Sequence, residues 1–252
     1  MASGSDSSMK KLKQLVCCTS NIPTTEIVFS LRSTDINGMP ILRAPVQQFD
    51  GCSSRHAAVV CTETIYRIEW AKREKPEAFP NLSIQHALDA TPTRITKFNI
   101  ISYLMEWLRE RGVTTEQLYS YCGMIGTDRS IGKDWVRHRI RGCYELTRAR
   151  VEREKMYDWL RKHLRDVGPF MGVFVKLSGY STSRDGHYSG KGELEMDSEH
   201  KVAIHTVPIT GYGIHEGVEV WEYMNFEGSD WGDEGFGTIP VTVIQEYFLP
   251  FL

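Results

Sequence analysis

A change of hydrophobic pattern near residue 169 constrains the fold of this chain more than any other feature. Before it, apolar residues recur at helical spacing in stretches 56–68, 83–89, 100–111 and 151–167. Gly168 and Pro169 stop the last of these predicted helices. Predicted strands then follow at 171–176, 202–209, 218–224 and 237–243. Helices followed by strands predict an α+β fold with a helical lobe and a β lobe.

The 252 residues are enough for one large domain behind a short tail. Residues 1–22 are polar and lysine-containing, and we expect them to be a disordered N-terminal tail. The remaining 23–252 are predicted to form a single domain, with a helical lobe at about 45–145 and a β lobe at about 23–44 and 146–252. The stretch 56–68 is apolar nearly all round, which is typical of a buried helix, and the serines at 53 and 54 are predicted to cap it.

Composition argues against several classes of function. The net charge of −2 gives no overall bias toward nucleic acid or anionic membranes, and no apolar run is long enough to span a bilayer. The six cysteines contain no Cys-x-x-Cys pair, so we expect no metal and no cofactor. The first residues lack the apolar core of a secretory signal, which predicts reduced thiols and a cytoplasmic or nuclear location.

The predicted helix 151–167 carries many charged side chains of both signs. Basic residues alternate with acidic ones along it. This pattern is more typical of a solvated face with spaced ion pairs than of a nucleic-acid patch. We therefore consider nucleic-acid binding unlikely on this basis and retain the helix as a candidate surface for a protein partner.

Three motifs in the second half of the chain occur in one order over about thirty residues. His205 opens a segment that reaches Gly-Tyr-Gly at 211–213, Trp221 precedes Asn225, and Trp231-Gly232 begins a glycine-rich turn. Together they resemble the active-site half of the papain-like cysteine proteases. Weaker similarities lie at 82–90, 119–123 and 168–170. The resemblance implies a helical left lobe, a β-barrel-like right lobe and a substrate cleft between them.

The same resemblance assigns roles to residues near the first helix. Papain-like enzymes place a reactive thiolate at a helix N-terminus, where the helix dipole and an imidazolium lower its pKa. Aligned without gaps, Cys52 takes the place of a disulfide-forming cysteine and Arg55 that of the nucleophile. His56 then replaces a tryptophan, and Phe49 replaces the glutamine that stabilises the oxyanion. Ala90 and Phe98 stand where other paired cysteines are expected, so the resemblance implies a disulfide-free member.

These departures predict a catalytically inactive protein. A guanidinium stays protonated and cannot attack a carbonyl carbon. Glu227 stands where the family has the tryptophan that shields the histidine–asparagine pair from water. Arg55, His205 and Asn225 are then vestigial triad positions. The expected function is binding of a peptide or protein, with Arg55, His205, Glu227 and Trp231 as candidate binding residues.

Two alternatives remain open. In the first, the turn before the helix is shortened and Cys52 acts as the nucleophile of an active intracellular endopeptidase, with His205 as base and Asn225 as orienter. In the second, the protein is a structural subunit of a complex and the cleft is vestigial.

Overall fold

A computed structural model describes residues 25–48, 51–75, 77–92, 97–126, 132, 134–147, 153–180, 186–197 and 200–252. The expected tail 1–22 lies outside the described residues, as does Phe49. The helices are α1 (Ser53–Lys72), α2 (Ile84–Ala90), α3 (Lys97–Glu110) and α4 (Arg153–Asp166). The strands are β1 (Thr25–Ser30), β2 (Asp35–Ile36), β3 (Met39–Pro40), β4 (Gly142–Thr147), β5 (Phe170–Val175), β6 (Ile204–His215), β7 (Val218–Met224), β8 (Phe236–Pro240) and β9 (Glu246–Phe251).

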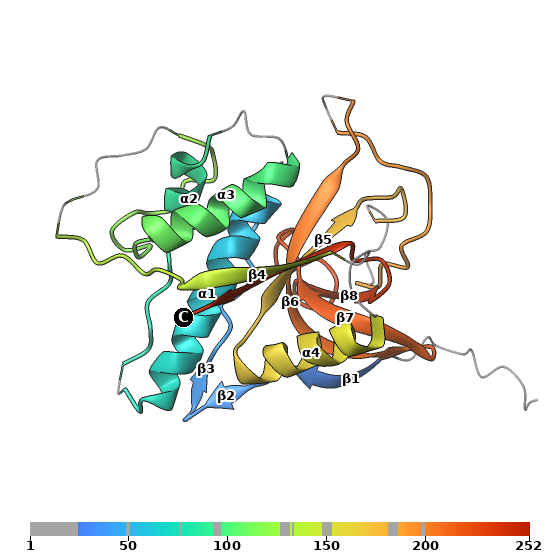
Figure 1. The fold of residues 1–252 in the computed structure, drawn as a ribbon, viewed down its shortest axis with the longest axis horizontal. Coiled ribbons are helices and arrows are strands. Elements are labelled where there is room, and N and C mark those ends of the chain that lie inside the picture. The colour runs from blue at the N-terminus through green and yellow to red at the C-terminus, as the bar shows by residue number, and fades with distance from the viewer. Residues whose placement is uncertain are drawn as a thin grey trace, which may run out of the picture.

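The α+β arrangement in two lobes is confirmed. Helices α1, α2 and α3 gather on one side of the molecule, and the large sheet lies on the other with α4 along it (Figure 1). Helix α1 is buried on nearly all sides, and its small side chains Ala57 and Cys61 belong to the same close-packed core as Leu104 and Leu108 of α3. None of the described helices is long and apolar enough to cross a bilayer.

The sheet of the β lobe is antiparallel. Its strand order is β4-β9-β5-β6-β7-β8, and β1 also pairs with β6. Trp221 and Phe170 pack edge to face at its centre, with ring centroids 5.6 Å apart. Leu160 and Leu164 of α4 belong to the same core, so α4 attaches through its apolar face and leaves its charged face to solvent.

An extended segment predicted at 26–31 corresponds to β1, and a turn predicted at Asn37-Gly38 joins β2 and β3, but β4 and β9 were not predicted. Strand β4 straddles the expected boundary between the lobes, and β9 lies between β4 and β5. The sequence of β9 shows no alternation of apolar and polar residues, because residues 247–250 are all buried. Pro250 is also unusual within a strand.

The strand predicted at 202–209 is longer in the structure and takes in Gly-Tyr-Gly at 211–213. These residues lie inside β6, which runs on to His215 beside β1. A Cβ atom added at Gly213 would lie 2.1 Å from the carbonyl oxygen of Glu26. The glycines therefore permit the close approach of two strands.

The prediction that Ser54 caps α1 was also wrong. The N-cap residue is Cys52, and its side chain makes no capping hydrogen bond. The two serines instead connect the lobes: the Ser53 hydroxyl accepts from the backbone N–H of Thr206 at 3.3 Å, and the Ser54 and Thr206 hydroxyls lie 3.0 Å apart. The two serine hydroxyls bond to the other lobe instead of capping the helix, because these contacts pair buried polar groups of both lobes.

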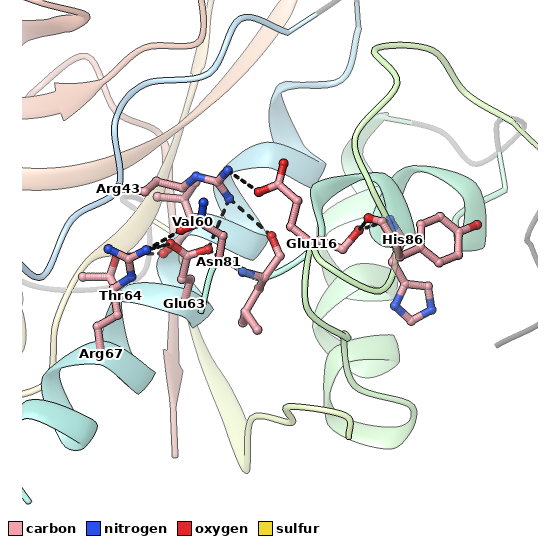
Figure 2. A network of polar contacts seen from close by, with 11 residues as sticks. Arg43, Val60, Glu63, Thr64, Arg67, Asn81, His86 and Glu116 are labelled. Carbon is pink, nitrogen blue, oxygen red and sulfur yellow. Dashed lines mark hydrogen bonds and ion pairs between the residues drawn. The ribbon is translucent and has the colours of Figure 1, made fainter. Parts of the chain in front are cut away.

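A buried ionic network stabilises the helical lobe (Figure 2). Glu63 of α1 forms ion pairs with Arg43 at 3.2 Å and with Arg67 at 2.9 Å. It also accepts from the backbone N–H of Leu82 at 2.7 Å, and Arg43 reaches Glu116 at 2.9 Å. Burial raises the pKa of Glu63, and the two arginines oppose that rise. The network joins α1 to three segments of chain around it.

Candidate active site

The start of α1 holds a cysteine and an arginine, and both are buried. Cys52 keeps 1% of its surface, and Arg55, the third residue of α1, keeps 7%. Side chains on a helix lean toward its N-terminus, so Arg55 leans back toward Cys52. Burial lowers the pKa of the Arg55 guanidinium, and Cys52 acts in the opposite direction. Arg55 therefore stands where the resemblance predicts the nucleophile.

His205 and Asn225 form a hydrogen-bonded pair in the β lobe. His205 lies in β6, Asn225 directly follows β7, and the distance from Nε2 to Oδ1 is 3.2 Å. Because Oδ1 is an acceptor, we assign the proton of a neutral imidazole to Nε2. The pKa of His205 is lowered to about 4. Burial is the main cause, the charge of Lys176 acts in the same direction, and the hydrogen bond to Asn225 acts against it. The imidazole is neutral at physiological pH.

Tyr180 covers this pair, a role that sequence reasoning missed. Its hydroxyl donates to Asn225 Oδ1 at 2.9 Å, and its ring centroid lies 5.1 Å from that of His205. Tyr180 is only 3% exposed, and Trp231 lies behind it with ring centroids 6.3 Å apart. Glu227, at the position of the missing tryptophan, is exposed. Tyr180 thus supplies the shielding that the tryptophan gives in the family.

His56 shapes the other side of the α1 start. Its Nδ1 lies 3.1 Å from the carbonyl oxygen of Cys52, and its Nε2 lies 3.3 Å from the hydroxyl of Tyr121. Phe226 packs against its ring, with centroids 5.1 Å apart. Burial lowers the pKa of His56 to about 4, so it contributes no charge at neutral pH. Aromatic rings therefore enclose the position that follows Arg55.

The structure brings only some of the expected site residues into contact. His205 and Asn225 are joined, and Trp231 approaches them through Tyr180. Within the described part of the chain, no hydrogen bond or ion pair links Arg55 to His205, to Asn225 or to a carboxylate. No group of three or more possible metal ligands occurs among the described residues. Arg55 and His205 therefore do not form one catalytic pair.

Comparison with known proteins places this geometry in a family. The profile of the papain family cysteine proteases matches residues 35–246. The chain belongs to the papain family. Among curated relatives, "Peptidase 1" of Euroglyphus maynei is 23% identical over 214 residues, which cover 81% of this chain and 60% of the relative. A viral cathepsin of Lymantria dispar multicapsid nuclear polyhedrosis virus is 32% identical over 136 residues, or 52% of this chain and 33% of the relative.

Solved papain-family structures share the fold. The proform of the ragweed pollen allergen Amb a 11, a cysteine protease, gives a TM-score of 0.63 at 19% identity, covering 92% of this chain and 67% of that one. Bromelain from Ananas comosus, in complex with the inhibitor E64, gives 0.60 at 20% identity, covering 88% of this chain and 99% of that one. The chain spans 60% of the length of the Euroglyphus maynei relative.

Proposed function

We propose that this papain-family protein is catalytically inactive and binds a peptide or protein partner. One observation supports the proposal: the third residue of α1 is a buried arginine, at the position that the gap-free alignment of the sequence gives to the nucleophile. The guanidinium has no lone pair available for attack on a carbonyl carbon. His205 remains, but it is neutral, buried and covered by Tyr180. It therefore has no exposed reacting group to deprotonate.

Covalent labelling with an epoxide inhibitor of thiol proteases tests the proposal directly. We expect intact mass spectrometry of the folded protein to show no adduct, because the thiol at the α1 start is buried. A general alkylating reagent is the matched control: exposed Cys122 should react well before buried Cys52. A stoichiometric epoxide adduct at Cys52 that disappears in His205→Ala would make the protein an enzyme.

Restoring a cysteine tests whether the thiol alone is missing. We expect Arg55→Cys to hydrolyse fluorogenic peptide substrates no faster than Arg55→Ser, a variant of similar size without a thiol. The reason is that burial lowers the pKa of His205 to about 4, which makes the imidazole too weak a base to form a thiolate at position 55. Hydrolysis by Arg55→Cys well above that of Arg55→Ser would show that the rest of the machinery is intact.

A second candidate keeps Cys52 as the nucleophile of an intracellular endopeptidase. It is supported by the place of Cys52 as N-cap of α1 beside a guanidinium, since both the helix N-terminus and the cation favour a thiolate. The labelling experiment above decides between the two. A third candidate is a structural subunit in which the cleft is vestigial and α4 binds the partner.

The charged face of α4 supports that third candidate only weakly. Arg161 pairs with Asp158 at 3.1 Å on the helix itself, and it also pairs with Glu219 of β7; Lys162 pairs with Asp166. Side chains already paired within the molecule offer less to a partner or to nucleic acid. We therefore propose that the partner binds at the α1 start.

We also propose a cytoplasmic or nuclear location, because the first residues lack the apolar core of a secretory signal.

A further inference from the structure

Two buried arginines in the helical lobe differ in their partners. Arg43, 8% exposed, reaches the carboxylates of both Glu63 and Glu116. Arg55 is as deeply buried, at 7%, and its Nε lies in the interior without a hydrogen-bond acceptor. No carboxylate within the described ranges forms an ion pair with it. A buried cation of this kind is unfavourable unless an anion is supplied to it.

The surroundings of Arg55 add to its positive potential. Helix α1 has 20 residues, and its N-terminus carries the positive end of the helix dipole. Its first turn contains no acidic residue, and the N-cap side chain makes no capping hydrogen bond. Dipole and guanidinium therefore act together on the same side, and within the described residues no carboxylate offsets either of them there; the Cys52 thiol alone acts on the guanidinium in the opposite sense.

A further donor lies in the segment that packs on this turn. Asn225 is fully buried, and its Nδ2 has no acceptor, while its Oδ1 accepts from both His205 and Tyr180. The next residue, Phe226, contacts His56, which follows Arg55 in α1. Unsatisfied donors thus occur on both sides of the junction between α1 and the β lobe, which is unusual for a folded interior.

We propose that the start of α1 binds a single carboxylate of the peptide or protein partner, with Arg55 as the group that pairs with it. The inference rests on the proposed binding function. A planar guanidinium pairs with a carboxylate through two parallel hydrogen bonds. One positive side chain matches one negative charge, and the neighbouring His56 is neutral at physiological pH, so a dianionic phosphate would lack a second cation. The carboxylate comes from a peptide C-terminus or from an acidic side chain.

Titration with sodium acetate at constant ionic strength tests the site. Resonances of the Arg55 Nε–H group and of the α1 amides should shift and saturate with acetate and not with acetamide. In Arg55→Gln the binding should weaken by about 10-fold or more, because the charge-assisted pair is lost. Arg109→Gln, which alters an exposed arginine of α3, is the matched control and should bind acetate as the parent does. Equal affinity in the parent and in Arg55→Gln would overturn the proposal.

A peptide pair identifies the source of the carboxylate. A peptide with a free C-terminus and the same peptide with a C-terminal amide, both without acidic residues, should differ in affinity if the terminus is bound; Glu-to-Gln pairs test the side chain. Loss of discrimination in both pairs would contradict the inference.

Arg55→Lys keeps the charge and removes the planar fork, so it should show intermediate affinity and covers the case in which Arg55→Gln does not fold. Labelling of Cys52 by the epoxide would refute the proposed function by a readout independent of acetate.

Discussion

Between pH 7 and pH 5 the protein is expected to lose several kcal/mol of its free energy of unfolding. Burial lowers the pKa of four histidines, His56, His86, His163 and His205, each to about 4. In the unfolded chain these groups titrate near 6.5. As the pH falls below about 6.5, the unfolded state therefore binds protons that the folded state does not bind. The free energy of unfolding falls until the pH reaches about 4.

The size of this effect follows from the width of the window. Each such histidine contributes a loss of about 2 kcal/mol by pH 5. Buried Glu63 and Glu222 act in the opposite direction, because burial raises their pKa and the folded state then holds protons longer than the unfolded one. Since an ordinary domain is stable by only about 5–15 kcal/mol, the histidines should move acid unfolding to about pH 5.

Urea unfolding at pH 7, 6 and 5 measures this loss. His163→Met is the informative variant, because His163 Nε2 is buried without a hydrogen-bond partner and the residue packs among apolar neighbours. The variant should reduce the slope by up to about 1.4 kcal/mol per pH unit. Leu160→Met changes a buried residue of the same helix that does not titrate and should leave the slope as it is. A stability that is constant from pH 7 to pH 5 would contradict the prediction.

Glu63→Ala is expected to destabilise the fold by about 3–5 kcal/mol. It removes the carboxylate that pairs with both Arg43 and Arg67, and it leaves the backbone N–H of Leu82 without its acceptor (Figure 2). At about 2–4 °C for each kcal/mol, the melting temperature should fall by roughly 6–20 °C.

The matched control for this variant lies on the same helix. Glu69→Ala removes an exposed partner of Lys72, an ion pair of 3.0 Å, and should cost less than about 1 kcal/mol. If Glu63→Ala cost no more than Glu69→Ala in thermal or urea unfolding, the buried network would not be a source of stability. The double variant Glu63→Leu with Arg67→Met should recover part of the loss, since it removes the cation that Glu63→Ala leaves without a carboxylate, while Arg43 keeps Glu116.

Much of the fold was predictable because local pattern and tertiary position agree there. The sequence predicted the four helices to within a few residues, and β7 was predicted with its observed bounds 218–224. Strand β9 was not, because its side chains are buried on both faces and such a run lacks the period-two alternation of a surface strand. The sheet position of β9 between β4 and β5 depends on partners distant in sequence.

The candidate site was predictable only where a motif fixed it. The family resemblance over β6 and β7 implied the pairing of His205 with Asn225, and His205 Nε2 lies 3.2 Å from Asn225 Oδ1. Tyr180 precedes a glycine- and serine-rich stretch with no periodicity, and its bond to Asn225 depends on how the chain folds back. Ser53 and Ser54 have good capping propensity, yet they are the first two residues of α1 and their hydroxyls contact Thr206 of the other lobe instead.

The place of β9 in the sheet has a consequence for synthesis of the protein. Within the described residues β4 pairs with β9, and β9 in turn pairs with β5 (Figure 1). On the ribosome β4 emerges well before β9, which is made only after β5 to β8. Translation proceeds at about 5–20 residues per second, so β4 spends several seconds with its backbone N–H and C=O groups unpaired. The nascent chain thus presents an open strand edge to chaperones, or to a second nascent copy, before the sheet can close.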